Sequence, residues 1–214
     1  MSHYEDEAQI EQLRRWWREN WIALIAGVSL GLAGIFGWEY YQKVRAVRAE
    51  TASRVFEDLK RLSPDQKDRA EELWRTLSTD HASTPYAAQG ALLLAAHAAA
   101  TEDWAGAQAR LEWARDHTDD PGLRNIAALR LARVLWQQQQ PDAALKLLDI
   151  ADDSPFAPLY QELRGDILLV KGDREAARAA YEKALQLGPA AAGRDGLQRK
   201  LDDLGGAAPA PAQS

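Results

Sequence analysis

Apolar residues are concentrated in one uninterrupted run near the N-terminus, whereas the rest of the chain alternates short apolar and polar stretches. The run from Trp21 to Trp38 contains 18 residues and no charged side chain. As a helix it would measure roughly 27 Å, and extension to Tyr41 carries it past the roughly 30 Å hydrocarbon core of a bilayer. Because lipid offers no hydrogen-bond partners, such a segment must pair its own backbone groups. The pattern therefore predicts a transmembrane helix over residues 21–41.

Aromatic residues at both ends of this run support the same interpretation. Amphipathic rings favour the headgroup region, and the chain places six of them there: Trp16, Trp17, Trp21, Trp38, Tyr40 and Tyr41. The alternative is a signal peptide cleaved after Ala33, where Gly31 and Ala33 satisfy the small-residue rule. Because the apolar run continues past that site and a polar segment precedes it, an uncleaved anchor is favoured.

The orientation of the span and its packing are less well specified. Three basic residues flank it on each side, Arg14, Arg15 and Arg18 against Lys43, Arg45 and Arg48, so the positive-inside rule leaves the orientation open. Within the span, Gly27, Gly31 and Gly34 lie on one helical face. Small residues at this spacing let a second helix approach closely, although glycine is also common in membrane helices generally. We expect this face to be the candidate for helix packing in the membrane.

After Arg48, helical patterns are separated by proline and glycine at regular intervals. Small residues recur at positions 95, 132 and 165, and again at 107, 144 and 177, so both series have intervals of 37 and 33 residues. These intervals are close to the roughly 34-residue period of the tetratricopeptide repeat. No stretch shows the period-two alternation of a strand. The predicted fold is all-α: a single N-terminal transmembrane helix followed by a tetratricopeptide-like helical-repeat solenoid.

Close packing explains the pattern of small residues. They let the two helices of a unit approach each other, while Leu111, Leu148 and Tyr181 fill the space against the next unit. A weaker leading unit contains Trp74 and Leu77. An ordinary bundle of alanine-rich helices is the alternative, but it does not explain why two series of positions keep one register.

The predicted organisation has four parts. Residues 1–20 form a short N-terminal segment, residues 21–41 the span, residues 42–204 the repeat domain and residues 205–214 a disordered tail. The last helix of the repeat domain, about residues 191–204, carries Leu197, Leu201 and Leu204 on one stripe and would cap the array.

Composition argues against several functional classes. The chain has 32 acidic and 26 basic residues and a net charge of −6, which disfavours nucleic-acid binding. The lack of cysteine excludes thiolate metal sites and cysteine nucleophiles. The four histidines have no partner at metal-ligand spacing, and no motif of a hydrolase, zinc protease, P-loop or dinucleotide-binding protein occurs. The sequence thus predicts no enzyme, no metal and no cofactor.

A binding surface remains as the candidate site. In stacked repeats the first helix of each pair lines a concave groove that binds extended ligands. Projection of the predicted helices places seven residues there: Leu92, Leu129, Arg133, Trp136, Glu162, Asp166 and Leu169. Repeat proteins that clamp a C-terminal carboxylate resemble one another in using Lys, Asn and Arg at such places. This chain has Leu92, Leu129 and Ala96 at several of them, which argues against a carboxylate clamp. A mixed apolar and charged groove suits a protein segment with exposed hydrophobic side chains.

Several segments together carry a resemblance to a known family. They are YEDEAQIEQLRRWWRENW at 4–21, GWEYYQ at 37–42, LRLARVLWQQQQPDAALKLLD at 129–149 and LRGDILLVKGDREAARAAYEKAL at 163–185. From about Tyr4 to Leu204 the chain resembles the YfgM family, described as an ancillary subunit of the bacterial SecYEG translocon. The resemblance implies an inner-membrane protein with a cytoplasmic N-terminus and a periplasmic repeat domain. It also implies association with the translocon and with the membrane-anchored periplasmic chaperone PpiD.

Together these features predict a scaffold tethered to the lipid bilayer by one span. Its groove would bind unfolded secretory proteins or a chaperone and help pass translocated proteins to periplasmic chaperones. The tether would raise the local concentration of the repeat domain near such partners. The alternative is a membrane-tethered regulatory adaptor whose repeat domain faces the cytoplasm and binds a signalling protein.

Overall fold

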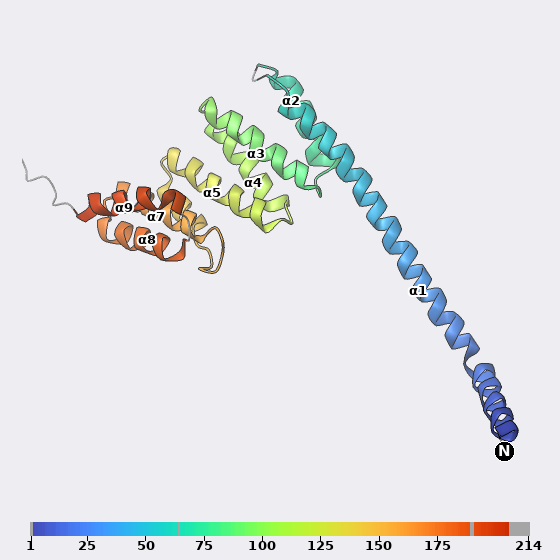
Figure 1. Ribbon diagram of the computed structural model, residues 1–214. Coiled ribbons are helices and arrows are strands. Elements are labelled where there is room, and N and C mark those ends of the chain that lie inside the picture. The colour runs from blue at the N-terminus through green and yellow to red at the C-terminus, as the bar shows by residue number, and fades with distance from the viewer. Residues whose placement is uncertain (1, 64, 189–190, 206–214) are drawn as a thin grey trace, which may run out of the picture. The chain divides into compact units, whose positions relative to one another are not determined.

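The computed structural model describes residues 2–63, 65–188 and 191–205, and all regular elements in those ranges are α-helices (Figure 1). The predicted all-α fold class is confirmed. The helices are α1 (Ser2–Lys60), α2 (Lys67–Asp80), α3 (Pro85–Ala100), α4 (Trp104–His117), α5 (Pro121–Gln137), α6 (Pro141–Leu147), α7 (Ala157–Val170), α8 (Arg174–Leu187) and α9 (Ala191–Gly205). The chain divides into two compact units after Glu50. Apart from Gly205, the predicted tail lies outside the described residues.

The first unit is the part of α1 that contains the apolar run. In the described part of the chain, α1 is the helix long and apolar enough to cross a membrane. Its apolar side chains are exposed, and Leu30 reaches 78% exposure. Such a surface would be unfavourable in water, whereas lipid solvates it. Residues 21–41, for which the sequence predicts a transmembrane helix, therefore form a helix whose apolar side chains are not covered by other parts of the protein.

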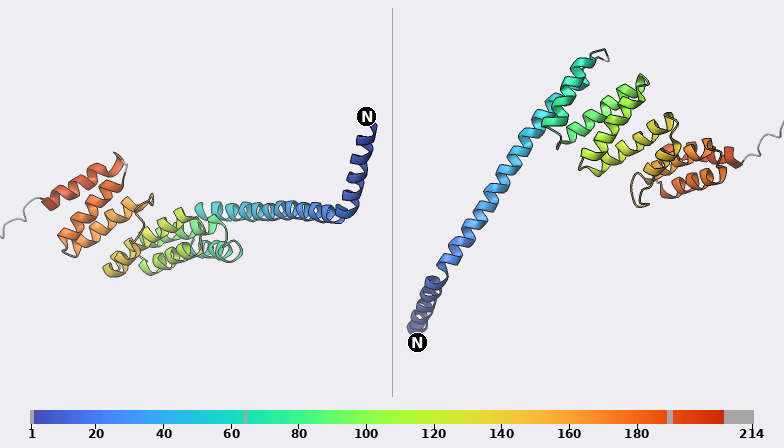
Figure 2. Two further views of the ribbon diagram at one scale, coloured as in Figure 1. Left: turned by 90° about the horizontal axis from the view of Figure 1, so that it is seen from below. Right: turned by 180° about the vertical axis from the view of Figure 1, so that it is seen from behind.

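The second unit consists of helix pairs, α3 with α4, α5 with α6 and α7 with α8, and the views in Figure 2 agree in placing the members of each pair side by side. The last residues of α1 join this unit, because Leu59 is buried in its core and Phe56 contacts Tyr86 of α3 with ring centroids 6.1 Å apart. Helix α9 packs on α8. The arrangement is the stack of helical pairs that the sequence predicts.

The same turn joins the two helices in all three pairs. Its central residue has a positive φ: 59° at Glu102, 61° at Gln139 and 86° at Gly172. The next backbone N–H donates to a carbonyl five residues earlier, as in a Schellman motif: Asp103 to Ala98 at 2.9 Å, Gln140 to Leu135 at 2.9 Å and Asp173 to Leu168 at 3.0 Å. The turns at 102, 139 and 172 are 37 and 33 residues apart. The turns therefore recur at the same intervals as the two series of small residues.

The small and large residues of the repeat pattern are buried. Ala107, Ala132, Ala144 and Ala177 are fully buried. Large side chains fill the space between helices, among them Leu111, Leu148 and Tyr181. Buried residues from α1 to α7 form one apolar cluster, and a second combines Ala177, Tyr181 and Ala184 with Leu197, Leu201 and Leu204 of α9. The predicted stripe of α9 thus covers the open side of the last pair.

Aspartates fix several helix starts. Asp120 accepts hydrogen bonds from the backbone N–H of Gly122 at 2.7 Å and of Leu123 at 3.0 Å, just before Pro121 opens α5. Asp103 and Asp173 cap α4 and α8 in the same way. Each such cap satisfies backbone donors that the helix leaves unpaired.

Candidate functional site

Two of the predicted groove residues belong to the core. Leu92 of α3 and Leu129 of α5 are each 7% exposed and lie in the first apolar cluster. A partner would not reach their side chains in this structure. Spacing along a helix can be read from the sequence, but the rotation of that helix against its neighbours cannot. The role of these two residues in partner binding stays a prediction that their burial does not support.

The acidic groove residues on α7 are occupied by the capping helix. Lys200 of α9 donates to Glu162 Oε1 at 2.9 Å and to Asp166 Oδ1 at 2.7 Å. Tyr181 of α8 donates its hydroxyl to the same Asp166 oxygen at 2.8 Å. Leu169 is half-buried against the second cluster. The third pair therefore presents an internally satisfied polar network where the sequence suggests an open binding surface.

Titration of this network follows from its contacts. Burial lowers the pKa of Lys200, but its hydrogen bonds to Asp166 and Glu162 outweigh that effect, so the pKa is raised overall. Burial also raises the pKa of the Tyr181 hydroxyl, and its hydrogen bond to Asp166 adds to the shift. Lys200 is thus held in its charged form.

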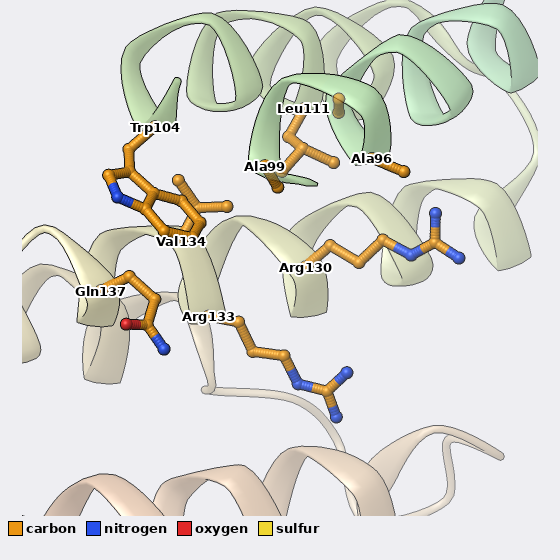
Figure 3. Close-up of a pocket in the computed structure, with 9 residues that line it drawn as sticks. Ala96, Ala99, Trp104, Leu111, Arg130, Arg133, Val134 and Gln137 are labelled. Atoms are coloured by element: carbon orange, nitrogen blue, oxygen red, sulfur yellow. The ribbon is translucent and has the colours of Figure 1, made fainter. Parts of the chain in front are cut away.

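Arg133 and Trp136 are the predicted residues that stay available on α5. Arg133 is exposed and Trp136 is half-buried against the first cluster. Arg133 lines a pocket of about 250 Å³ formed where α3, α4 and α5 meet (Figure 3). We call it the arginine pocket; its lining residues are Ala95, Ala96, Ala99, Trp104, Leu111, Arg130, Arg133, Val134 and Gln137.

The local structure explains how these side chains meet. Alanines on α3 leave room that larger residues would fill. The positive-φ turn at Glu102 reverses the direction of the chain within a few residues, and the Trp104 N–H donates to the Glu102 carbonyl at 2.9 Å. The turn therefore places Trp104, the first residue of α4, beside the pocket. On α5, Arg130, Arg133 and Gln137 follow at helical spacing and so share one face.

Polarity is divided across the arginine pocket. Trp104, Val134 and Leu111 lie between the helices, whereas the side chains of Arg130 and Arg133 leave α5 toward the same side (Figure 3). Among the described residues, none forms an ion pair or a side-chain hydrogen bond with either guanidinium. The site can therefore accept an apolar group with a negative charge beside it.

Sequence reasoning found Arg133 but missed most of this pocket. Arg130 was detectable, because it precedes Arg133 by three residues and therefore shares its helical face. Trp104 and Ala99 come from other helices, and their approach depends on the turn between them. Nothing in the spacing along α5 indicates that approach.

The glycine face of the span is open. A Cβ placed at Gly27, Gly31 or Gly34 would meet no atom within 4 Å. A second helix could thus approach this face without displacing a side chain of α1. Its role in packing stays a prediction.

Comparison with known proteins gives consistent similarities. A family model described as a tetratricopeptide repeat-like domain matches residues 14–206. A protein of Escherichia coli K12 is 32% identical over 205 residues, which is 95% of this chain and 99% of that protein. A Haemophilus influenzae protein is 34% identical over 86% of this chain and 90% of its own length. A Neisseria gonorrhoeae protein is 30% identical over 95% of this chain and 99% of its own length. All three are named ancillary SecYEG translocon subunit.

Proposed function

The chain belongs to the tetratricopeptide repeat-like family of the ancillary SecYEG translocon subunits, and from this premise we propose that it is itself a membrane-anchored scaffold of the Sec translocon. The observation that supports this proposal most is the extent of the similarity, which spans 95% of the chain and so covers both the apolar run and the repeats. Its binding surfaces, rather than any bond-making chemistry, would carry the function.

The apolar run of α1 supports an inner-membrane location. We propose that residues 21–41 cross the bilayer once and that Gly27, Gly31 and Gly34 pack against a helix of the translocon or of a second copy. Their open face and small size favour such contact. Tethering keeps the repeat domain at a high effective concentration near the translocon without requiring a tight contact.

The repeat domain would act after translocation. We propose that it faces the periplasm and passes translocated proteins to a periplasmic chaperone such as PpiD. Stacked helical pairs suit the binding of extended segments, and the arginine pocket offers apolar surface beside free positive charge. A regulatory adaptor with a cytoplasmic repeat domain is the alternative, and orientation separates the two.

Orientation is tested by reporter fusions after Ser214. A reporter active only in the periplasm should give signal, and one active only in the cytoplasm should not. The opposite result would favour the adaptor. The same reporters fused to the N-terminus of the full-length chain provide the reciprocal control, since one span places the two ends on opposite sides.

Partner binding is tested by photocrosslinking in native membranes. A photoreactive residue replaces exposed Gln137 beside the arginine pocket, or Gly31 in the span. We expect the first to label a periplasmic chaperone or a chain in transit, and the second to label a translocon subunit. Glu182, exposed on α8, is the control position. Absence of translocon, chaperone and secretory products from both test positions would refute the proposal.

A further inference from the structure

The size of the arginine pocket limits what it can bind. Pockets that hold whole small molecules usually measure about 300–1,000 Å³, and this one is smaller, at about 250 Å³. Its walls are mostly apolar, and Trp104 is the largest of the lining side chains. One large apolar side chain matches these dimensions and this lining.

Two positive charges at the edge of the pocket favour a ligand that carries negative charge. Arg130 and Arg133 lie three residues apart on α5, where like charges repel. No described carboxylate forms an ion pair with Arg130 or Arg133, and the two predicted acidic groove residues, Glu162 and Asp166, are bound by Lys200 instead. A carboxylate from outside could bind either guanidinium group, each of which can form two parallel hydrogen bonds with it.

We propose that the arginine pocket binds an extended segment of a partner protein in which one large apolar side chain is flanked by carboxylates. The apolar side chain enters beside Trp104, and the carboxylates meet Arg130 and Arg133. The inference deepens the proposed function, on which it rests, by giving the chemistry of the bound segment. Residues 206–214 of the chain, GAAPAPAQS, carry no acidic side chain and no large apolar one. They therefore do not match this description.

The test uses the full-length protein in detergent micelles and fluorescein-labelled peptides of the form Gly-Ser-X-Φ-X-Ser-Gly. X is Asp, Asn or Lys, and Φ is Leu, Met, Phe or Gly. Fluorescence polarisation should show the tightest binding for Asp with an apolar Φ. Replacing Asp by Asn, or the apolar Φ by Gly, should weaken binding about tenfold or more, since charged hydrogen bonds and apolar burial are lost.

Two variants assign the binding to the pocket. The double variant R130Q/R133Q should reduce the affinity for Asp peptides to that for Asn peptides. The variant A96L, at an exposed position that lines the pocket, should weaken peptides with an apolar Φ and leave Gly-centred ones unchanged. R61Q/R75Q removes two exposed charges outside the pocket and should change neither. Circular dichroism spectra should be the same for all variants.

Several outcomes would overturn the inference. The inference is wrong if no peptide of the set gives saturable binding, or if Asp and Asn peptides bind with equal affinity. It is also wrong if Asp peptides bind with the same affinity whatever residue stands at Φ, which would indicate an anion site only. These outcomes are distinct from failure of the proposed function. Crosslinks from Gly31 to the translocon with no peptide binding would reject the pocket alone. Peptide binding with no translocon, chaperone or secretory product crosslinked from either Gly31 or Gln137 would reject the translocon scaffold alone.

Discussion

Replacing Gly165 by alanine tests the packing of the third helix pair. A Cβ at Gly165 would lie 2.5 Å from Cδ1 and 2.9 Å from Cζ of Tyr181, where ordinary contacts are 3.4–4 Å. The ring has little freedom to move, because Tyr181 is fully buried and its hydroxyl is bonded to Asp166 at 2.8 Å. The added methyl group must therefore displace the ring or push α7 from α8.

The expected loss combines two opposing effects. Overpacking a well-packed core costs about 1–3 kcal/mol, whereas alanine in place of glycine within a helix returns up to about 1 kcal/mol. The approach of about 1 Å closer than normal contact favours the upper range, so we expect a net loss of about 1–2 kcal/mol. For a chain of this size, that corresponds to a melting temperature lower by roughly 2–8 °C.

Thermal unfolding of the full-length protein in detergent, followed by far-ultraviolet circular dichroism, measures this loss. Gly196→Ala on α9 is the matched control, because the nearest atom to its added Cβ is 4.0 Å away. It should be neutral or stabilising by up to about 1 kcal/mol. In a Tyr181→Leu background, Gly165→Ala should cost less, because the ring it strikes is gone. A Gly165→Ala protein as stable as the control variant would refute the packing argument.

Three further predictions concern caps and charges. Asp120→Ala should destabilise the second unit by about 1 kcal/mol through loss of the cap on α5, measured by thermal unfolding, whereas exposed Asp119→Ala should have almost no effect. Lys200→Met should leave Glu162 and Asp166 without their shared cation, although Asp166 keeps its hydrogen bond from Tyr181, and cost about 1 kcal/mol. Amide exchange in α9 should then be faster than in the wild type, and exchange in α4 unchanged. Because the pKa of Lys200 is raised on folding, its contribution is complete below about pH 10 and is lost above the raised value, so wild type should lose more stability than Lys200→Met on going from pH 9 to pH 12. Equal losses would contradict this.

Much of the fold was predictable because close packing of helix pairs requires small residues at regular intervals in the sequence. Alanines at 107 and 144 recur where paired helices touch, and their burial matches the prediction. The turns were less predictable. Gly172 is an expected residue for positive φ, but Glu102 and Gln139 adopt it as well, although side chains disfavour that region. Packing of the helix pair on each side holds those two residues in a conformation that local preference would not choose.

The binding surface was harder to predict because it depends on contacts between distant residues. Lys200 reaches Asp166 across 34 positions and Glu162 across 38. No periodicity encodes that ion pair, so two residues expected in the groove lie in a closed network. The arginine pocket likewise requires a turn to bring Trp104 to α5. Only the residues contributed by α5 itself could be read from the spacing.

The repeated turn also explains where this chain tolerates a change in length. In every pair, the positive-φ residue lies seven positions after one small residue and five before the other: 95, 102 and 107; 132, 139 and 144; 165, 172 and 177. Positions 107 and 132 are 25 residues apart and positions 144 and 165 are 21 apart, so the whole difference of four falls between successive pairs. Insertions and deletions are therefore accommodated in the connectors, while each helical hairpin is a unit of fixed length.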